Sequence, residues 1–211
     1  INIELSLSNK LKLVDALEEF FAGELPLFHQ DDEQVGNAEL LGNRPQQARE
    51  LLAAVRTRWH WLLDNLDAPL ASCSFFTPSP QPSPASGRGS NTSPLPLVGE
   101  GLGERVFDAL QNHTLRASWK QELREPLLQL FSGRTYQTIL EQCNALHQSV
   151  LKSRVFVALH MHAGDGNVHT NIPVNSDDYA MLQQANHAVD RIMQLAKDLG
   201  GVISGEHGIG I

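Results

Sequence analysis

The chain has 211 residues, 41% of them hydrophobic, with 16 basic and 24 acidic side chains and a net charge of −8. That apolar fraction suffices for a hydrophobic core and excludes a wholly disordered chain, while the acidic balance argues against nucleic-acid binding. No run of about eighteen apolar residues occurs, so we expect no membrane-spanning segment.

The two ends of the sequence lead us to expect a piece of a longer protein. The chain begins Ile1-Asn2-Ile3, with neither an initiator Met nor a signal peptide. It stops at Ile211, directly after a glycine-rich run that reads like part of a motif. A functional site near this end would then be only partly contained in the chain.

Two amphipathic helices are predicted in the first third of the chain. Residues 9–21 carry apolar side chains at helical spacing, and Gly23 follows as a stop signal. A polar loop is expected over residues 24–43. Pro45 suits the first turn of a second helix over residues 46–66, which again has one apolar side.

The composition changes sharply at residues 77–104, which hold six of the eleven prolines and five of the sixteen glycines. Such a stretch cannot hold a helix or a central strand, so we predict a disordered insertion over residues 73–104. The alternative is a Pro-rich ligand for an aromatic groove. The glycines at 99–103 do not form a dinucleotide-binding fingerprint, because their spacing is wrong and no strand precedes them.

The rest of the chain predicts an α+β fold, with an antiparallel sheet flanked by helices. Residues 105–150 read as helical, interrupted near Pro126 and again near Gly133. Residues 154–161 are β-branched and apolar, which predicts a buried strand, and residues 167–174 predict a second strand. A helix is expected to begin at Ser176 and to end at Gly200-Gly201, before a short strand over residues 202–204.

The helix that precedes the strands and the long helix that follows them each have a predicted buried face. The first consists of Ile139, Leu140, Cys143, Leu146, His147 and Val150, and the second of Leu182, Ala185, Val189, Ile192, Ala196 and Leu199. Cys143 therefore reads as a small core residue, and Cys73 as an incidental thiol beside the insertion. Two cysteines form no disulfide framework and no Cys-only metal site, and they fit a reducing compartment.

The chemistry is concentrated where the two predicted strands join. Asp165-Gly166 is a strong signal for a two-residue hairpin turn, because such turns need positive φ. That register places His162 opposite His169, and His160 on the same face opposite Asn171. Directly opposed Cβ atoms lie about 4.5–5.5 Å apart, so the two imidazoles can converge on one divalent metal ion.

A carboxylate would complete such a site. Glu206 lies between glycines in Gly205-Glu206-His207-Gly208, and two His with one carboxylate are typical of a catalytic metal centre with open positions. His207 would then be available for acid–base work. The plainer alternatives are surface or core histidines and a simple turn, in which Asp165 is only a turn former. We assign His160 to packing or to the surroundings of the ligands.

The run from His162 to Asn171, together with the run from Gly201 to Gly210, resembles the C-terminal domain of FAD-linked oxidases. The branch it resembles contains D-lactate and D-2-hydroxyglutarate dehydrogenases, in particular large bacterial members that also carry an iron–sulfur domain. The resemblance is strongest over residues 120–211, weaker over 1–72 and absent from 73–104. It implies a ferredoxin-like cap that is incomplete at both ends, with residues 1–72 and 105–211 as its two parts.

The resemblance also implies roles for individual residues. His162, His169 and Glu206 match metal-ligand positions, and the metal is zinc or manganese. His207 matches the catalytic base, Asn171 a substrate contact, and Asn167 a position close to the flavin. The implied reaction is oxidation of a small D-2-hydroxy acid, with the metal orienting the substrate and the flavin as the electron acceptor.

Several consequences of the resemblance concern parts that this sequence lacks. FAD would be bound mainly by a separate N-terminal domain, so the chain alone is expected to be inactive. An iron–sulfur cluster would need CxxC-type motifs, which do not occur here. We expect a cytoplasmic location, with peripheral attachment to the inner membrane as an alternative, and leave the final electron acceptor open. The competing functions are a stand-alone metal-dependent hydrolase and an interaction module that uses the Pro-rich segment.

Overall fold

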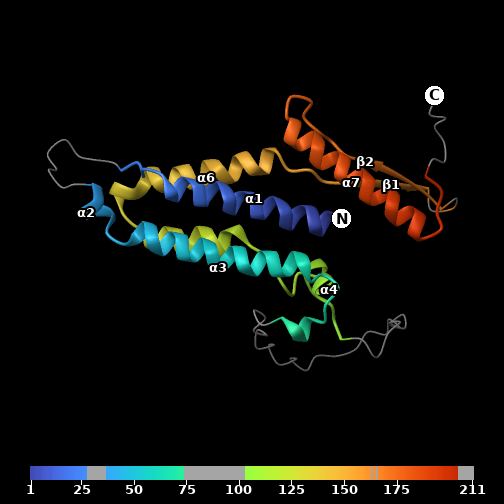
Figure 1. Cartoon of the computed structure of the whole chain (residues 1–211), viewed down its shortest axis with the longest axis horizontal. Helices are drawn as coiled ribbons and strands as arrows, with labels where there is room; N and C mark the ends of the chain where they lie inside the picture. The colour runs from blue at the N-terminus through green and yellow to red at the C-terminus, as the bar shows by residue number, and fades with distance from the viewer. Residues whose placement is uncertain (28–36, 74–102, 163, 165, 204–211) are drawn as a thin grey trace, which may run out of the picture.

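A computed structural model describes residues 1–27, 37–73, 103–162, 164 and 166–203. Within these residues the chain forms a body of helices and an arm made of one β-hairpin and one long helix (Figure 1). The predicted α+β class is confirmed. The predicted disordered insertion falls almost wholly on residues 74–102, which lie outside the described part.

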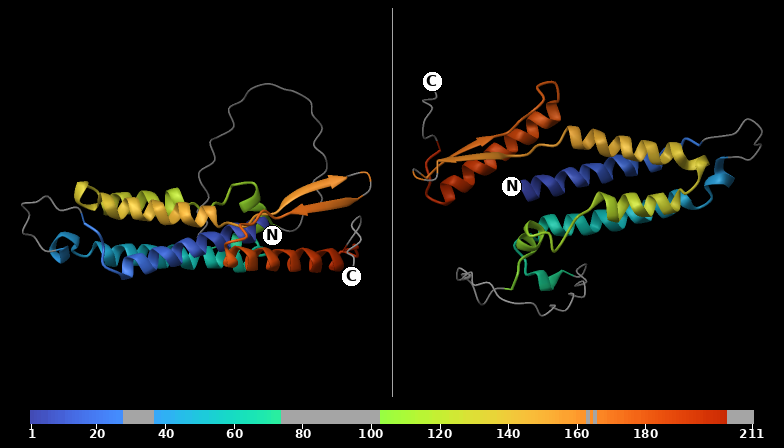
Figure 2. Two further views of the ribbon diagram at one scale, coloured as in Figure 1. Left: turned by 90° about the horizontal axis from the view of Figure 1, so that it is seen from above. Right: turned by 180° about the vertical axis from the view of Figure 1, so that it is seen from behind.

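The body contains most of the helices, and its long helices α1, α3 and α6 lie side by side along its length (Figures 1 and 2). They are α1 (Asn2–Ala22), α2 (Asn37–Leu41), α3 (Arg44–Asp64), the 3₁₀ turn η1 (Leu70–Ser72), α4 (Val106–Gln111), the π-helical turn η2 (Trp119–Arg124), α5 (Glu125–Leu130), the 3₁₀ turn η3 (Arg134–Tyr136) and α6 (Gln137–Lys152). The arm contains β1 (Ala158–His162), β2 (Asn167–Asn171) and α7 (Tyr179–Asp198).

Helix α1 begins at Asn2, seven residues before the predicted start at Asn9. The reason is that the buried stripe of this helix extends back to Leu7 and not only to Leu11. The stripe packs against α3, whose start beside Pro45 is as predicted. The two helices supply about half of the core residues, among them Leu7, Leu11, Leu13, Val14, Leu17, Phe21, Leu52, Val55, Trp59 and Leu62.

The second half of the body is also largely as predicted. Pro126 lies in the first turn of α5, and Gly133, at φ +114°, separates α5 from the next helical segment. The predicted inner face of α6 is confirmed, with Ile139 and Cys143 fully buried. Cys73 is not the incidental thiol that we expected, because its side chain is only 5% exposed and packs in the same core.

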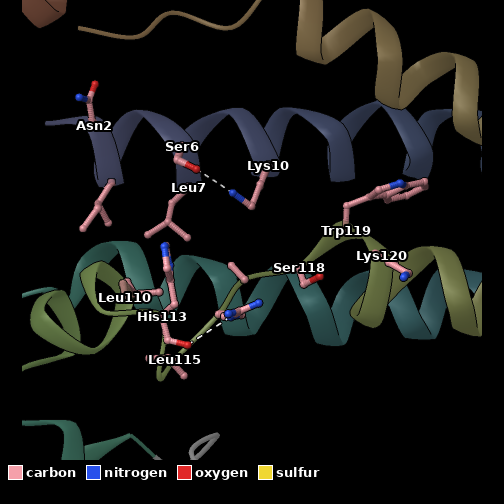
Figure 3. A pocket seen from close by; sticks show the side chains of 13 residues that line it. Asn2, Ser6, Leu7, Lys10, Leu110, His113, Leu115, Ser118, Trp119 and Lys120 are labelled. Atoms are coloured by element: carbon pink, nitrogen blue, oxygen red, sulfur yellow. Dashed lines mark hydrogen bonds between the residues drawn. The ribbon is translucent and has the colours of Figure 1, made fainter. Parts of the chain in front are cut away.

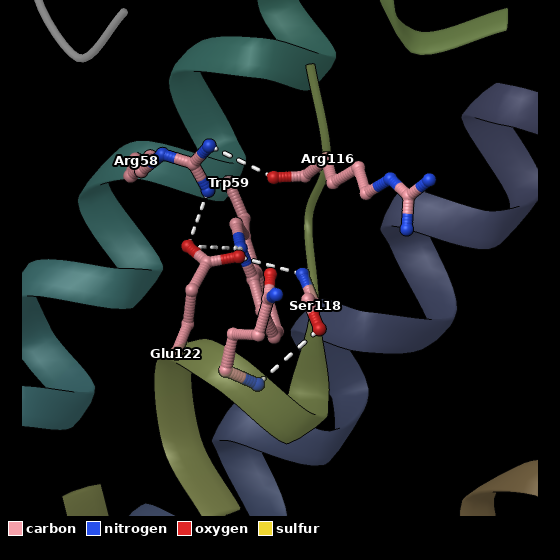
Figure 4. Close-up of polar contacts among 6 residues, drawn as sticks. Arg58, Trp59, Arg116, Ser118 and Glu122 are labelled. Atoms are coloured by element: carbon pink, nitrogen blue, oxygen red, sulfur yellow. Dashed lines mark hydrogen bonds and ion pairs between the residues drawn. The ribbon is translucent and has the colours of Figure 1, made fainter. Parts of the chain in front are cut away.

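A partly buried carboxylate ties η2 to α3. The carboxylate of Glu122 accepts hydrogen bonds from the Trp59 indole N–H at 3.2 Å and from the Ser118 backbone N–H at 2.6 Å, and it pairs with the guanidinium of Arg58 (Figure 4). Arg58 also donates to the carbonyl of Arg116 at 2.9 Å. Because Arg58 and Glu122 are paired with each other, the group joins two helical segments without leaving a partly buried charge unpaired.

The chain on either side of the predicted insertion is held together by backbone hydrogen bonds. The Leu70 N–H donates to the Glu104 carbonyl at 2.6 Å, the Val106 N–H to the Ala68 carbonyl at 3.0 Å, and the Phe107 N–H to the Leu66 carbonyl at 2.8 Å. Pro69 and Arg105 form an antiparallel bridge. Residues 66–70 and 104–107, which lie on either side of the predicted insertion, are therefore neighbours in the body.

The arm is attached to the body at the start of α1. The Asn2 side chain donates to the Val157 carbonyl at 3.0 Å and accepts from the Val157 N–H at 2.9 Å. Lys12 donates to Gln184 of α7 at 2.8 Å. A small second core forms there from Val155, Met181 and Ala185, with Leu5 and Ile172 packed against it.

Helix α7 differs from the prediction at its start and in its buried face. Asp178, and not Ser176, caps the helix, because its carboxylate accepts from the Met181 N–H at 2.9 Å. The buried residues are Met181, Ala185 and Ala188, whereas Leu199, predicted to be buried, is 85% exposed. The helix does end where expected, since Gly200 takes φ +74°.

Two strand predictions need correction. The first strand is not buried: Leu159 and Met161 are 63% and 60% exposed, because the chain leaves the body after Val157 and no described residue covers the hairpin. Residues 202 and 203 are not in a strand, and Val202 is 88% exposed. No helix in the described part is long and apolar enough to cross a membrane.

Candidate functional site on the β-hairpin

The hairpin brings three histidines together, in a register that differs from the prediction. Strands β1 and β2 are antiparallel, with His160 opposite His169 and His162 opposite Asn167. The predicted pairings, His162 opposite His169 and His160 opposite Asn171, are both wrong. The strands are joined by four residues, 163–166, and not by a two-residue turn.

The two glycines explain the longer connection. Gly166 takes φ +67°, as expected of a turn residue. The last pair of the strands is His162 with Asn167, so residues 163–166 all belong to the connection. Gly164 and Gly166 thus both fall in the loop, where backbone freedom is useful. Asp165, the predicted turn former, lies outside the described residues, as does Ala163.

The alternation along the strands survives the change of register, because the shift is two residues and not one. One face carries His160, His162, Asn167, His169 and Asn171. The opposite face carries Leu159, Met161, Val168 and Thr170. All of the predicted site residues that the structure describes therefore share one face of the hairpin.

The three imidazole rings form a compact cluster. The ring centres are 5.4 Å apart for His162 and His169, 5.3 Å for His160 and His162, and 6.3 Å for His160 and His169. The ring of His160 meets that of His162 edge to face, with 87° between the ring planes. His160 thus packs against His162, its neighbour two residues along the same strand.

The spacing of His162 and His169 fits a shared metal ion. With Zn–N bonds of about 2.0–2.1 Å and tetrahedral geometry, two bound imidazoles have ring centres about 5 Å apart. Within the described ranges, however, no three His, Cys, Asp or Glu side chains are arranged to hold a metal ion. A complete site would need a ligand from elsewhere, and Glu206 and His207 both lie outside the described residues.

The two asparagines lie at opposite ends of the same face of the hairpin. Asn167 is half-buried and lies opposite His162, at the loop end of the hairpin. Asn171 is exposed and lies opposite Ala158, where the hairpin meets the body. A substrate on this face could therefore contact a histidine and an amide at once, with amide groups that both donate and accept hydrogen bonds.

Comparison with known proteins bears on this part of the chain. Residues 134–211 match the family described as FAD linked oxidases, C-terminal domain. The predicted resemblance is confirmed for this stretch. It contains α6, the hairpin with its three histidines, α7 and the run that includes Glu206 and His207.

Short stretches of the chain are also similar to curated proteins. A stretch of 54 residues is 43% identical to the glycolate oxidase subunit GlcD of Escherichia coli (strain K12), covering 26% of this chain and 11% of that protein. A stretch of 72 residues is 31% identical to the subunit of the same name from Bacillus subtilis (strain 168), covering 34% of this chain and 15% of that protein. No solved structure matches the chain.

Proposed function

We propose that the chain is part of a flavin-dependent dehydrogenase that oxidises a D-2-hydroxy acid, such as D-lactate or D-2-hydroxyglutarate, to the 2-oxo acid. The observation that carries the proposal is the face shared by His162, His169 and Asn171, within the stretch that matches FAD-linked oxidases. The names of the similar subunits support it, since glycolate is itself a 2-hydroxy acid.

In this proposal, His162, His169 and Glu206 hold one divalent metal ion, zinc or manganese. The observation in favour is the 5.4 Å separation of the two imidazole rings and the preference of these ions for imidazole and carboxylate ligands. A metal held by these residues would supply a Lewis acid for the hydroxyl and carboxylate oxygens of a hydroxy acid. His160 keeps the rings in place through its edge contact with His162.

Other residues of the chain act on the substrate directly. Asn171 donates a hydrogen bond to the carboxylate of the substrate, and His207 takes the proton from its hydroxyl group. Asn167, at the loop end of the hairpin, lies closest to the flavin. The C–H bond at the α-carbon breaks with loss of a hydride, and FAD, held mainly by another domain of the protein, would supply the acceptor for this hydride. The same proposal gives the whole protein an iron–sulfur domain and a cytoplasmic location. It also treats residues 73–104 as an insertion that divides the domain into residues 1–72 and 105–211.

The experiment uses the purified full-length gene product. Under anaerobic conditions, D-lactate or D-2-hydroxyglutarate should bleach the visible absorption band of the flavin, and the L-enantiomers should leave it unchanged. A colourless protein that hydrolyses esters or amides would overturn the proposal and favour the metal-dependent hydrolase. A flavin that is reduced equally by both enantiomers would contradict the proposed substrate class.

A further inference from the structure

Two adjoining cavities lie beside α1, away from the histidine face. The first, of about 680 Å³, lies between α1 and residues 110–120 (Figure 3). The second, of about 370 Å³, lies between α1, the end of α6 and residues 154–156. Asn2, Ser6, Lys10 and Trp119 line both. We call the two together the α1 cleft, and no residue of β1 or β2 lines it.

The charges around the α1 cleft have one sign. Lys10 lines both cavities, Arg116 and Lys120 line the first, and Arg154 lines the second. Among the described residues, no Asp or Glu side chain lines either cavity. In a chain with a net charge of −8, such a gathering of cations gives the cleft a local positive potential that favours anions.

These cations are not used in ion pairs within the described part of the chain. The ammonium group of Lys10 donates to the Ser6 hydroxyl at 2.7 Å, and the guanidinium of Arg116 donates to the His113 carbonyl at 3.2 Å. The nearby carboxylate of Glu122 is already engaged by Arg58, Trp59 and Ser118. Burial lowers the pKa of Lys10 and outweighs the opposite effect of Glu122, so a bound anion would relieve an unfavourable charge.

The walls of the cleft are suited to a flat apolar group. Trp119 lines both cavities, and its ring stacks on that of His147 with centres 4.7 Å apart and 17° between the planes. Leu13 and Val150 line the second cavity. Asn9 also lines it, 9% exposed, with a buried Oδ1 that has no hydrogen-bond partner among the described residues. A ligand with a hydroxyl or N–H group could satisfy that atom.

We propose that the α1 cleft is a binding site for a small organic anion with a planar apolar body and a hydrogen-bond donor. The ammonium group of Lys10 and the guanidinium of Arg154 bind the anionic group, while Trp119 and the aliphatic side chains contact the body. The volumes lie in the range of about 300–1,000 Å³ that is usual for small-molecule sites. Carboxylate and phosphate both suit a Lys–Arg pair.

The experiment is isothermal titration calorimetry on the full-length gene product with three probes. They are 4-hydroxybenzoate, 4-hydroxyphenyl phosphate and the neutral 4-hydroxybenzamide, which all carry the same phenolic hydrogen-bond donor. We expect at least one anion to bind with a Kd at least tenfold lower than that of the amide. The better anion identifies the ligand as a carboxylate or a phosphate. Equal affinity for all three, or no binding of either anion, would overturn the proposal.

Matched variants locate the binding. Lys10→Met removes the charge and keeps the aliphatic stem, and it should weaken binding of the anion at least tenfold. Lys12→Met is the control, because Lys12 lies on the same helix but donates to Gln184 outside the cleft. The double variant His162→Ala, His169→Ala should bind the anion as the wild type does. Weakening by Lys12→Met as strong as by Lys10→Met, or loss of binding in the histidine double variant, would contradict the assignment.

Folding is checked separately. Lys10→Met should leave the circular dichroism spectrum and Tm close to those of the wild type, since it removes a partly buried charge without opening the core. Arg154→Gln provides a second test on an exposed residue. It should weaken anion binding as well, and unchanged binding in both variants would overturn the proposal whatever their stability.

Discussion

His160 and His169 face each other directly across the β-hairpin, while His162 lies diagonally from His169. Even so, the ring centre of His162 lies 5.4 Å from that of His169, whereas the ring centre of His160 lies 6.3 Å from it. The residue that pairs with His169 through the backbone is thus not the residue whose ring lies nearer to it. The metal pair that we propose is a diagonal one, with the third imidazole beside it.

A pair of cysteine variants tests this register. Directly opposed residues have Cα atoms about 4.5–5.5 Å apart, which a disulfide can span, whereas diagonal neighbours are about 7–8 Å apart. We expect His160→Cys, His169→Cys to oxidise readily to a disulfide and His162→Cys, His169→Cys to resist. Mass spectrometry of the oxidised proteins measures this. A disulfide that forms more readily between positions 162 and 169 would contradict the observed register and favour the predicted two-residue turn.

Only part of the hairpin structure could be predicted from the sequence. Alternation along the strands correctly placed the histidines and asparagines on one face, because the side-chain period does not depend on loop length. The register depended on whether Gly164 belonged to the loop or to the strand, which local sequence could not decide. Burial of β1 was mispredicted because its apolar residues were read as core, whereas Leu159 and Met161 lie in an arm outside the body.

The helical body was easier to predict. The spacing of apolar residues in α1, α3 and α6 reflects one continuous core, and the proline and glycine signals at Pro45, Pro126 and Gly133 mark real boundaries. The α1 cleft was not predictable, because Lys10, Trp119 and Arg154 are brought together only by packing of segments far apart in sequence.

The segment between the two halves of the body should be dispensable. Replacing residues 74–102 by a short Gly-Ser linker retains Cys73 in the core and the hydrogen bond from Leu70 to Glu104. Because shortening a loop changes its closure entropy by only about 1 kcal/mol, Tm should stay within a few degrees of the wild type. A thermal melt followed by circular dichroism checks this. A large fall in Tm would show that the segment packs against the body.

The buried thiol of Cys143 should make stability depend on alkaline pH. Burial raises the pKa of Cys143 to about 12, while an unfolded thiol ionises near about 8.5. Above that pH the unfolded chain loses this proton and the folded chain keeps it, so the free energy of unfolding falls by up to about 1.4 kcal/mol per pH unit.

Urea unfolding of the wild type and Cys143→Ala at several pH values isolates the effect. The difference in the free energy of unfolding between the wild type and the variant should be constant below about pH 8.5. It should then shift progressively against the wild type toward about pH 12. The direction follows from a folded pKa above the unfolded one. A difference between the two proteins that stays constant from pH 7 to pH 10.5 would contradict this account.

His207 should act as the base and not as a metal ligand. In the full-length gene product, His207→Asn keeps a polar side chain but removes the proton acceptor, so kcat should fall by roughly two to four orders of magnitude. Metal content should remain that of the wild type. His187→Asn on α7 is the control and should change neither quantity. Loss of metal from His207→Asn would make His207 a ligand, and full activity would place the base elsewhere, with His160 next to be tested.

The metal content of the full-length gene product tests the central claim most directly. Elemental analysis should find close to one zinc or manganese ion per chain in the wild type and in the control variant Thr170→Ala, whose side chain lies on the other face of the hairpin. The double variant His162→Ala, His169→Ala should contain almost none. Near-stoichiometric metal in that double variant, or none in the wild type, would contradict a metal site on the histidine face.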